Sequence, residues 1–170
     1  MKDEDREWVE LRLACVHEAA HEIVVMAYGG QGQSRVWRNK SAGAVAGEER
    51  LWAGQFLMYA SPGAVQWTSE RRELFGIEPA VPSNWRVLVG MAGLVGESME
   101  EGERTAAGVF ARILCEITRG SASETDQALM GERWTNRDVA KVMRLLRRRW
   151  DRLQRRAAEL QADALDEHLA

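Results

Sequence analysis

The chain is short of the residues on which several protein classes depend. It holds two cysteines, three histidines and three prolines among 170 residues. Two cysteines cannot build a disulfide framework, which favours a reducing compartment. The longest apolar stretch, residues 87–95, has about half the length that a membrane helix needs. The net charge of −3 gives the whole molecule no general attraction for nucleic acid.

The length of the chain and its first residues exclude further classes of protein. A chain of 170 residues is expected to form one domain, residues 1–170, and is long enough to bury a hydrophobic core. Its first residues, MKDEDREW, are acidic and polar, unlike a secretory signal peptide. We therefore expect a cytoplasmic protein without a membrane-spanning segment.

Two of the three histidines fall in one motif. Residues 17–21 read HEAAH, within a stretch that predicts a helix over residues 6–27. Because helical positions i and i+4 share a face, His17 and His21 can bind one metal ion. A zinc ion with three protein ligands keeps a position for water, whose pKa falls towards ~7. Glu18 can take the proton of that water during attack on a peptide carbonyl.

The alternative is that His17 and His21 are ordinary surface or core residues of an amphipathic helix. Apolar residues flank the motif, so two imidazoles there must satisfy their ring nitrogens, and a metal ion does so well. The sequence therefore favours a metal site.

The third ligand is harder to assign. His168 lies near the end of the chain, where fraying is expected, so a carboxylate is favoured. Glu48 and Glu49 follow a predicted hairpin too closely to return to the first helix. Glu97 lies in a glycine-rich helix that can pack directly on it, and Asp126 stands where a loop becomes a helix. Spacing alone leaves Glu97 and Asp126 as competing alternatives.

The remaining patterns predict a mainly α fold. In the first half of the chain we expect a β-hairpin with strands at 35–37 and 44–46, and short helices at 55–59 and 69–75. In the second half we expect a helix from residue 85, a helix over 103–118 and a helix beginning after the polar loop 121–126. One long helix is expected to run from a capping box at Thr135 nearly to the C-terminus. Glycines in the helix from residue 85 predict close packing of another backbone.

The long C-terminal helix carries a heptad-like apolar seam and a dense set of basic residues. The seam is expected to pack on the domain body, with dimerisation as the alternative. The basic residues favour a solvated face over nucleic-acid contact, since no recognition motif accompanies them. The seam comprises Met143, Leu146, Trp150, Leu153, Ala157, Leu160 and Ala164, and the basic set comprises Lys141, Arg144, Arg147, Arg148, Arg149, Arg152, Arg155 and Arg156.

The text VHEAAHEIVVMAY resembles the active-site helix of FtsH-type metallopeptidases, the zinc peptidase part of membrane-bound AAA proteases, where H-E-A-G-H-A is usual. Residues 35–37 and 44–46 are similar to that family's short strands after the motif. Residues 92–97 (AGLVGE) are similar to its Gly-Gly-Arg-x-Ala-Glu segment. Residues 123–128 (SETDQA) resemble the stretch that holds its third zinc ligand.

The resemblance implies a zincin-like helical metallopeptidase domain that uses zinc. It implies His17, His21 and Asp126 as metal ligands and Glu18 as the catalytic base. Glu97 would then have a supporting role, orienting a histidine ring. It also implies that the edge of the small β element can receive an extended peptide.

The chain departs from the family in several places. Ala20 replaces a glycine, Leu94 replaces an arginine, and residues 51–82 form a longer insertion. No ATPase domain or membrane segment is seen. We therefore expect cleavage of flexible or unfolded polypeptides, or cooperation with a separate ATPase or other protein partner.

Two function classes follow. The first is a zinc-dependent endopeptidase, and the second is a non-catalytic, metal-stabilised interaction module that binds a protein or nucleic-acid partner through its arginine-rich helix. Glu18 favours the enzyme, because a purely structural site needs no base beside it. Structural zinc sites also usually have four protein ligands, and the sequence offers three.

Overall fold

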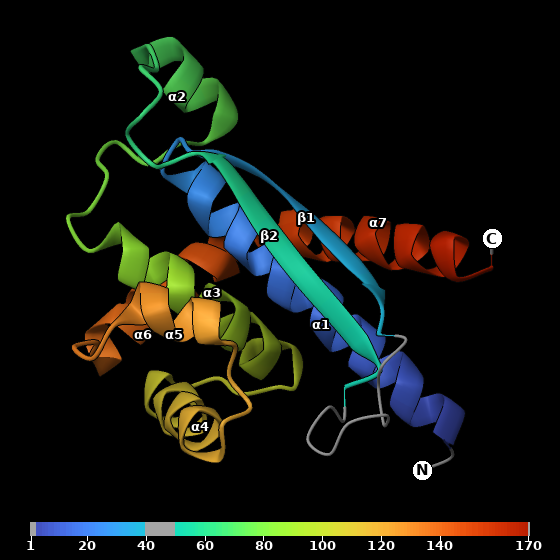
Figure 1. Cartoon of the computed structure of the whole chain (residues 1–170). Helices are drawn as coiled ribbons and strands as arrows, with labels where there is room; N and C mark the ends of the chain where they lie inside the picture. The colour runs from blue at the N-terminus through green and yellow to red at the C-terminus, as the bar shows by residue number, and fades with distance from the viewer. Residues whose placement is uncertain (1–2, 40–49, 170) are drawn as a thin grey trace.

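The computed structural model describes residues 3–39 and 50–169. These residues form seven helices and one antiparallel pair of strands, which confirms the mainly α fold with a small hairpin (Figure 1). The elements are α1 (Asp3–Ala27), β1 (Gln31–Arg38), β2 (Trp52–Ala60), α2 (Ser69–Phe75), α3 (Trp85–Glu100), α4 (Ala106–Arg119), α5 (Glu124–Met130), α6 (Asn136–Arg148) and α7 (Trp150–Leu169).

Helix α1 is the central element. The hairpin, α3 and α7 all pack on it, so apolar residues are buried around most of its circumference (Figure 1). The helix ends where it was predicted to end, at Ala27, because Gly29 takes a left-handed φ of 77°. The next residue, Gly30, then donates its N–H to the carbonyl of Val25 at 2.9 Å.

Helix α3 lies between α1 and α5, and its glycines allow both to approach. A Cβ on Gly96 would stand 2.9 Å from the Cβ of Ala20 on α1, and one on Gly90 would stand 2.8 Å from the carbonyl oxygen of Asp126 on α5. The prediction that these glycines mark close packing is confirmed. This packing brings α5 within reach of α1.

The hairpin differs from its prediction. The first strand, at 35–37, lies within β1 as expected, whereas residues 44–46 lie outside the described part of the chain. β1 pairs instead with β2, in a register that sets Arg38 opposite Trp52. The helix predicted at 55–59 was therefore wrong. Pairing with β1 outweighs the helix propensity of this run, and its accessibility alternates as in a half-buried strand.

The predicted single C-terminal helix is also wrong. The capping box at Thr135 is present, with Asp138 as its partner, but the helix is interrupted at Arg149, which has φ −120°. The guanidinium of Arg149 donates to the carbonyl of Gly76 at 2.6 Å and to Glu78 at 2.8 Å. This interruption separates α6, which packs on α3 and α4, from α7, which packs on α1 and β1.

The apolar seam of these two helices packs on the domain body, as the sequence predicted. Its buried members are Met143, Leu146, Leu153, Ala157, Leu160 and Ala164.

The helix expected at 69–75 is confirmed as α2, and the one expected over 103–118 begins later, at Ala106, after its N-cap Thr105. No helix in residues 3–39 and 50–169 is long and apolar enough to cross a membrane. The single domain remains a prediction.

Candidate metal centre

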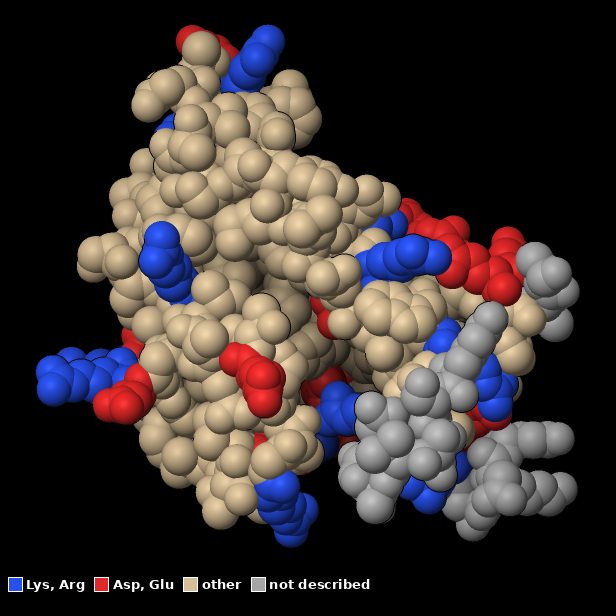
Figure 2. Space-filling model, viewed as in Figure 1, with Lys and Arg blue, Asp and Glu red and all other residues tan. Residues whose placement is uncertain are grey.

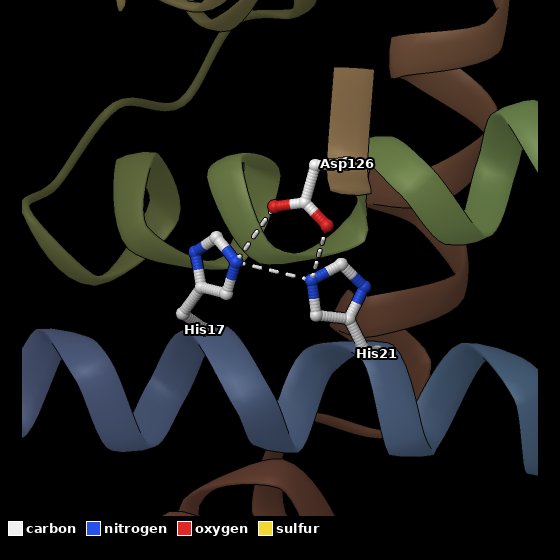
Figure 3. A group of neighbouring side chains, drawn as sticks. All are labelled: His17, His21 and Asp126. Atoms are coloured by element: carbon white, nitrogen blue, oxygen red, sulfur yellow. Dashed lines mark hydrogen bonds and ion pairs between the residues drawn. The ribbon is translucent and has the colours of Figure 1, made fainter. Parts of the chain in front are cut away.

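Three side chains from two elements converge on one point (Figure 3). His17 and His21 project one turn apart from α1, and Asp126 reaches them from α5. Nε2 of His17 lies 3.0 Å from Nε2 of His21 and 3.0 Å from Oδ2 of Asp126. Nε2 of His21 lies 3.3 Å from Oδ1 of Asp126. All three residues are buried, with at most 9% of their surface exposed.

The other ring nitrogens are already occupied. Nδ1 of His17 lies 2.6 Å from Oε1 of Glu97, and Nδ1 of His21 lies 2.8 Å from the carbonyl oxygen of Val89. A carbonyl or carboxylate oxygen can only accept, so both Nδ1 atoms carry the proton. In the neutral rings, each Nε2 therefore presents a lone pair to the other and to Asp126.

Such a cluster of acceptors requires a positive charge at its centre. Burial alone lowers the pKa of His17, but hydrogen bonds to Asp126 and Glu97 outweigh it and raise that pKa well above its usual value. Burial likewise opposes the charge on Asp126, yet hydrogen bonds to the two histidines hold the pKa of its carboxyl far below its usual range. Without a metal ion, a proton on His17 supplies the charge. A cation held by all three residues would replace that proton.

The geometry and chemistry of the three donors fit a metal ion. Two imidazole nitrogens and a carboxylate oxygen form a ligand set that zinc accepts in proteins. A tetrahedral ion with bonds of about 2.0–2.1 Å would place its ligand atoms about 3.3 Å apart. The observed separations of 3.0–3.3 Å are close to this value. The group of His17, His21 and Asp126 could therefore hold a metal ion.

Local sequence fixes each donor in place. The hydroxyl of Ser123 caps α5 by accepting from the backbone N–H of Asp126 at 3.1 Å. The missing side chain of Gly93 makes room for the ring of His17, because a Cβ there would overlap the imidazole. These two features give His17 and Asp126 defined positions in the fold itself.

The group faces a cleft of about 470 Å³. His17, Glu18 and His21 line it from α1, residues 54–56 line it from β2, and residues 123–126 line it from the start of α5. In Figure 2, which has the same orientation as Figure 1, the surface is hollowed in the middle of this face, with acidic side chains inside the hollow. The donors are thus buried but open on one side.

Glu18 also lines this cleft, beside the group of His17, His21 and Asp126. Its carboxylate lies against the backbone of Gly54, where a Cβ would clash with it. Burial raises the pKa of Glu18, and the neighbouring imidazoles of His17 and His21 partly oppose that rise. Within the described residues, no donor forms a hydrogen bond to its carboxylate, so both oxygens are available to a molecule in the cleft.

The structure places the two candidate third ligands, Glu97 and Asp126, on different sides of the His17 ring. Asp126 reaches both Nε2 atoms, whereas Glu97 contacts the far side of the His17 ring. His168 lies elsewhere, beside Arg38 and Trp52. The two other rejected candidates, Glu48 and Glu49, lie outside the described residues.

Sequence reasoning missed three groups of the site. These are the carbonyl of Val89 that orients His21, Gly93 under the ring of His17, and Gly54 beside Glu18. The glycine spacing signalled close packing at residue 93 but not what packs there. Every residue has a backbone carbonyl, so a pattern of residue types cannot predict which carbonyl will contact His21.

Comparisons with known proteins add no assignment. No model of a known protein family matches this chain, and no curated protein matches it. Any assignment of function therefore depends on the geometry of the site.

Proposed function

We propose that the protein is a zinc-dependent endopeptidase of the FtsH-like, zincin type, which hydrolyses flexible or unfolded polypeptides. One observation carries the proposal. The Nε2 atoms of His17 and His21 and the carboxylate of Asp126 converge at 3.0–3.3 Å, in the cleft that the carboxylate of Glu18 also lines. This combination joins a metal-ligating group to a base in one cleft.

The roles of the residues follow from their positions. When bound, zinc supplies Lewis acidity that lowers the pKa of water and polarises a carbonyl group. Glu18 accepts a proton from the attacking water at its free carboxylate oxygen and passes it to the leaving amide nitrogen. Glu97 holds the proton on Nδ1 of His17 and so keeps Nε2 of that ring free to bind the metal.

The burial of the site supports an extended substrate. His17, His21 and Asp126 are between 4% and 9% exposed, so a folded surface cannot reach them, whereas a single extended segment can enter the cleft. Within the described sheet, β2 pairs with β1 on one side only. Its Gly54–Phe56 segment borders the cleft, where backbone groups can bind a peptide in extended conformation.

Two observations favour the enzyme over a metal-stabilised interaction module. The described residues bring three protein ligands together, which leaves a position open to the cleft, whereas a structural site is closed by a fourth. In addition, Arg147, Arg148 and Arg156 of the basic set bind groups within the chain. Fewer arginines are therefore available to a partner.

The test is cleavage of a fluorescently labelled unfolded polypeptide, such as casein, by zinc-loaded protein. Glu18→Gln should retain zinc and lose cleavage by about a hundredfold or more, as expected for removal of a general base. The control is Glu132→Gln, which removes an exposed carboxylate that does not line the cleft and should leave activity unchanged. A Glu18→Gln protein as active as the wild type would contradict the proposal.

A further inference from the structure

A second cavity lies away from the metal centre. It has a volume of about 790 Å³, within the usual range for small-molecule sites. Lys141, Arg144, Arg147 and Arg148 line it from α6, and Tyr28 lines it from the end of α1. None of these residues contributes to the cleft at His17 and His21.

The charge of the cavity wall is strongly positive. Among the described residues that line the cavity, Glu78 is the one carboxylate, against four basic residues. Its charge is already neutralised, because Arg148 and Arg149 bind it at 2.9 and 2.8 Å. In the described part of the chain, no carboxylate forms an ion pair with Lys141 or Arg144. These two cations are therefore available to an anion in the cavity.

Tyr28 provides an independent sign of a ligand. Tyr28 is 4% exposed, yet no group in the described residues forms a hydrogen bond with its hydroxyl. Among the described polar side-chain atoms that are fully sealed from solvent, only Nε1 of Trp52 lacks a hydrogen-bond partner. Because the hydroxyl of Tyr28 lacks a partner but is not among these sealed atoms, it must still contact open space. The cavity that Tyr28 lines is that space. Burial and the charge of Glu78 raise the pKa of Tyr28, so its hydroxyl remains a donor.

The rest of the wall is apolar. Pro79, Ala80, Pro82 and Leu145 complete it, and the cavity is much larger than an inorganic anion. A ligand that fills it needs an anionic end for the basic residues and an apolar body for the prolines. An excess of three positive charges in the wall favours a dianion over a monoanion.

We infer that this cavity binds a small organic molecule carrying a phosphate group, with Lys141, Arg144 and the Tyr28 hydroxyl as donors to the phosphate and the proline wall against its organic part. This site does not depend on the proposed peptidase activity. It stands on α6, whose basic residues were expected to form a solvated face.

The experiment is calorimetric titration of the full chain with phenylphosphonate, inorganic phosphate and benzoate. Phenylphosphonate should bind most tightly, since it has both a dianionic and an apolar part. Arg144→Gln should weaken its binding about tenfold, as expected for loss of a charged hydrogen bond. Tyr28→Phe should weaken it by about three- to tenfold. This second variant removes a hydroxyl that has no hydrogen-bond partner in residues 3–39 and 50–169, so the protein should fold normally.

Two controls distinguish binding in this cavity from binding elsewhere on the chain. Arg155→Gln removes an exposed charge that does not line the cavity and should leave the affinity unchanged. A phosphonate can also bind zinc, so the titration is repeated after metal removal by a chelator and should give the same affinity. Equal affinity in Arg144→Gln, Tyr28→Phe and wild type, or loss of binding on chelation, would overturn the inference. Benzoate or inorganic phosphate binding as tightly as phenylphosphonate would overturn the assignment of the ligand.

Discussion

Nδ1 of His17 lies 2.6 Å from Oε1 of Glu97, on the side of the ring that faces away from Asp126. Burial opposes the charge on Glu97, yet its hydrogen bond to His17 lowers the pKa of its carboxyl below the usual value. The carboxylate therefore accepts a hydrogen bond from the N–H at Nδ1 and fixes the orientation of the ring. His17 is thus held between two carboxylates, Glu97 at Nδ1 and Asp126 at Nε2.

This arrangement predicts unequal effects of removing the two charges. Glu97→Gln should lower zinc affinity by about 10- to 100-fold, the usual cost of losing an orienting partner. Asp126→Asn should lower it much further, because it replaces an anionic ligand. Competition titration with a chromophoric chelator measures both affinities. A larger loss in Glu97→Gln than in Asp126→Asn would exchange their roles.

Substitutions at two glycines of α3 should affect zinc affinity and stability to different degrees. Gly93→Ala places a methyl group against the ring of His17, so zinc affinity should fall along with stability. Gly96→Ala crowds Ala20 of α1 and should lower the free energy of unfolding by about 1–3 kcal/mol, as overpacking usually does. Its effect on zinc affinity should be small. Equal zinc affinity in Gly93→Ala and wild type would contradict the placement of the ring.

Stability of the metal-free protein should have an unusual pH dependence. The raised pKa of His17 gives stabilisation that is complete below its unfolded pKa of about 6.5 and is lost as pH rises through the folded value. The lowered pKa of Asp126 gives stabilisation that is complete above its unfolded pKa of about 3.9 and is lost as pH falls through the folded value. This contribution is therefore largest between those two values.

Thermal unfolding of chelator-treated protein across this range measures the effect. The Tm should decline above about pH 6.5, while the Tm of zinc-loaded protein should not, since deprotonated ligands favour the metal. His17→Gln removes the titrating group and should abolish the decline in chelated protein. A decline of the same size in His17→Gln and wild type would assign it to other groups.

The two cysteines should differ in reactivity. Cys15 is completely buried beside the motif, and burial raises the pKa of its thiol to about 12. Since the thiolate is the reactive form, Cys15 should resist a thiol reagent in the folded protein. Cys115 is half-buried and should react first. Titration with a chromogenic disulfide should show one accessible thiol per folded chain and two after denaturation. Two rapidly reacting thiols in the folded chain would contradict the burial of Cys15.

Local patterns predicted the elements that depend on local interactions. The end of α1 follows from Gly29 and Gly30, and the start of α6 follows from the capping box of Thr135 and Asp138. The motif on α1 indicated a metal site because helical geometry alone brings His17 and His21 together.

Elements that depend on distant partners were predicted less well. Trp52–Ala60 forms a strand because β1 pairs with it, and the C-terminal helix breaks because Arg149 binds Gly76 and Glu78, more than 70 residues away in the chain. Spacing could not choose between Glu97 and Asp126, since both reach His17 and only the side of the ring distinguishes them.

The most direct test is the zinc content of the full chain purified without chelators, measured by elemental mass spectrometry with folding checked by circular dichroism. The convergence of His17, His21 and Asp126 predicts about one zinc ion per folded chain. A folded protein that holds no zinc, even after incubation with the ion and dialysis, would contradict the account.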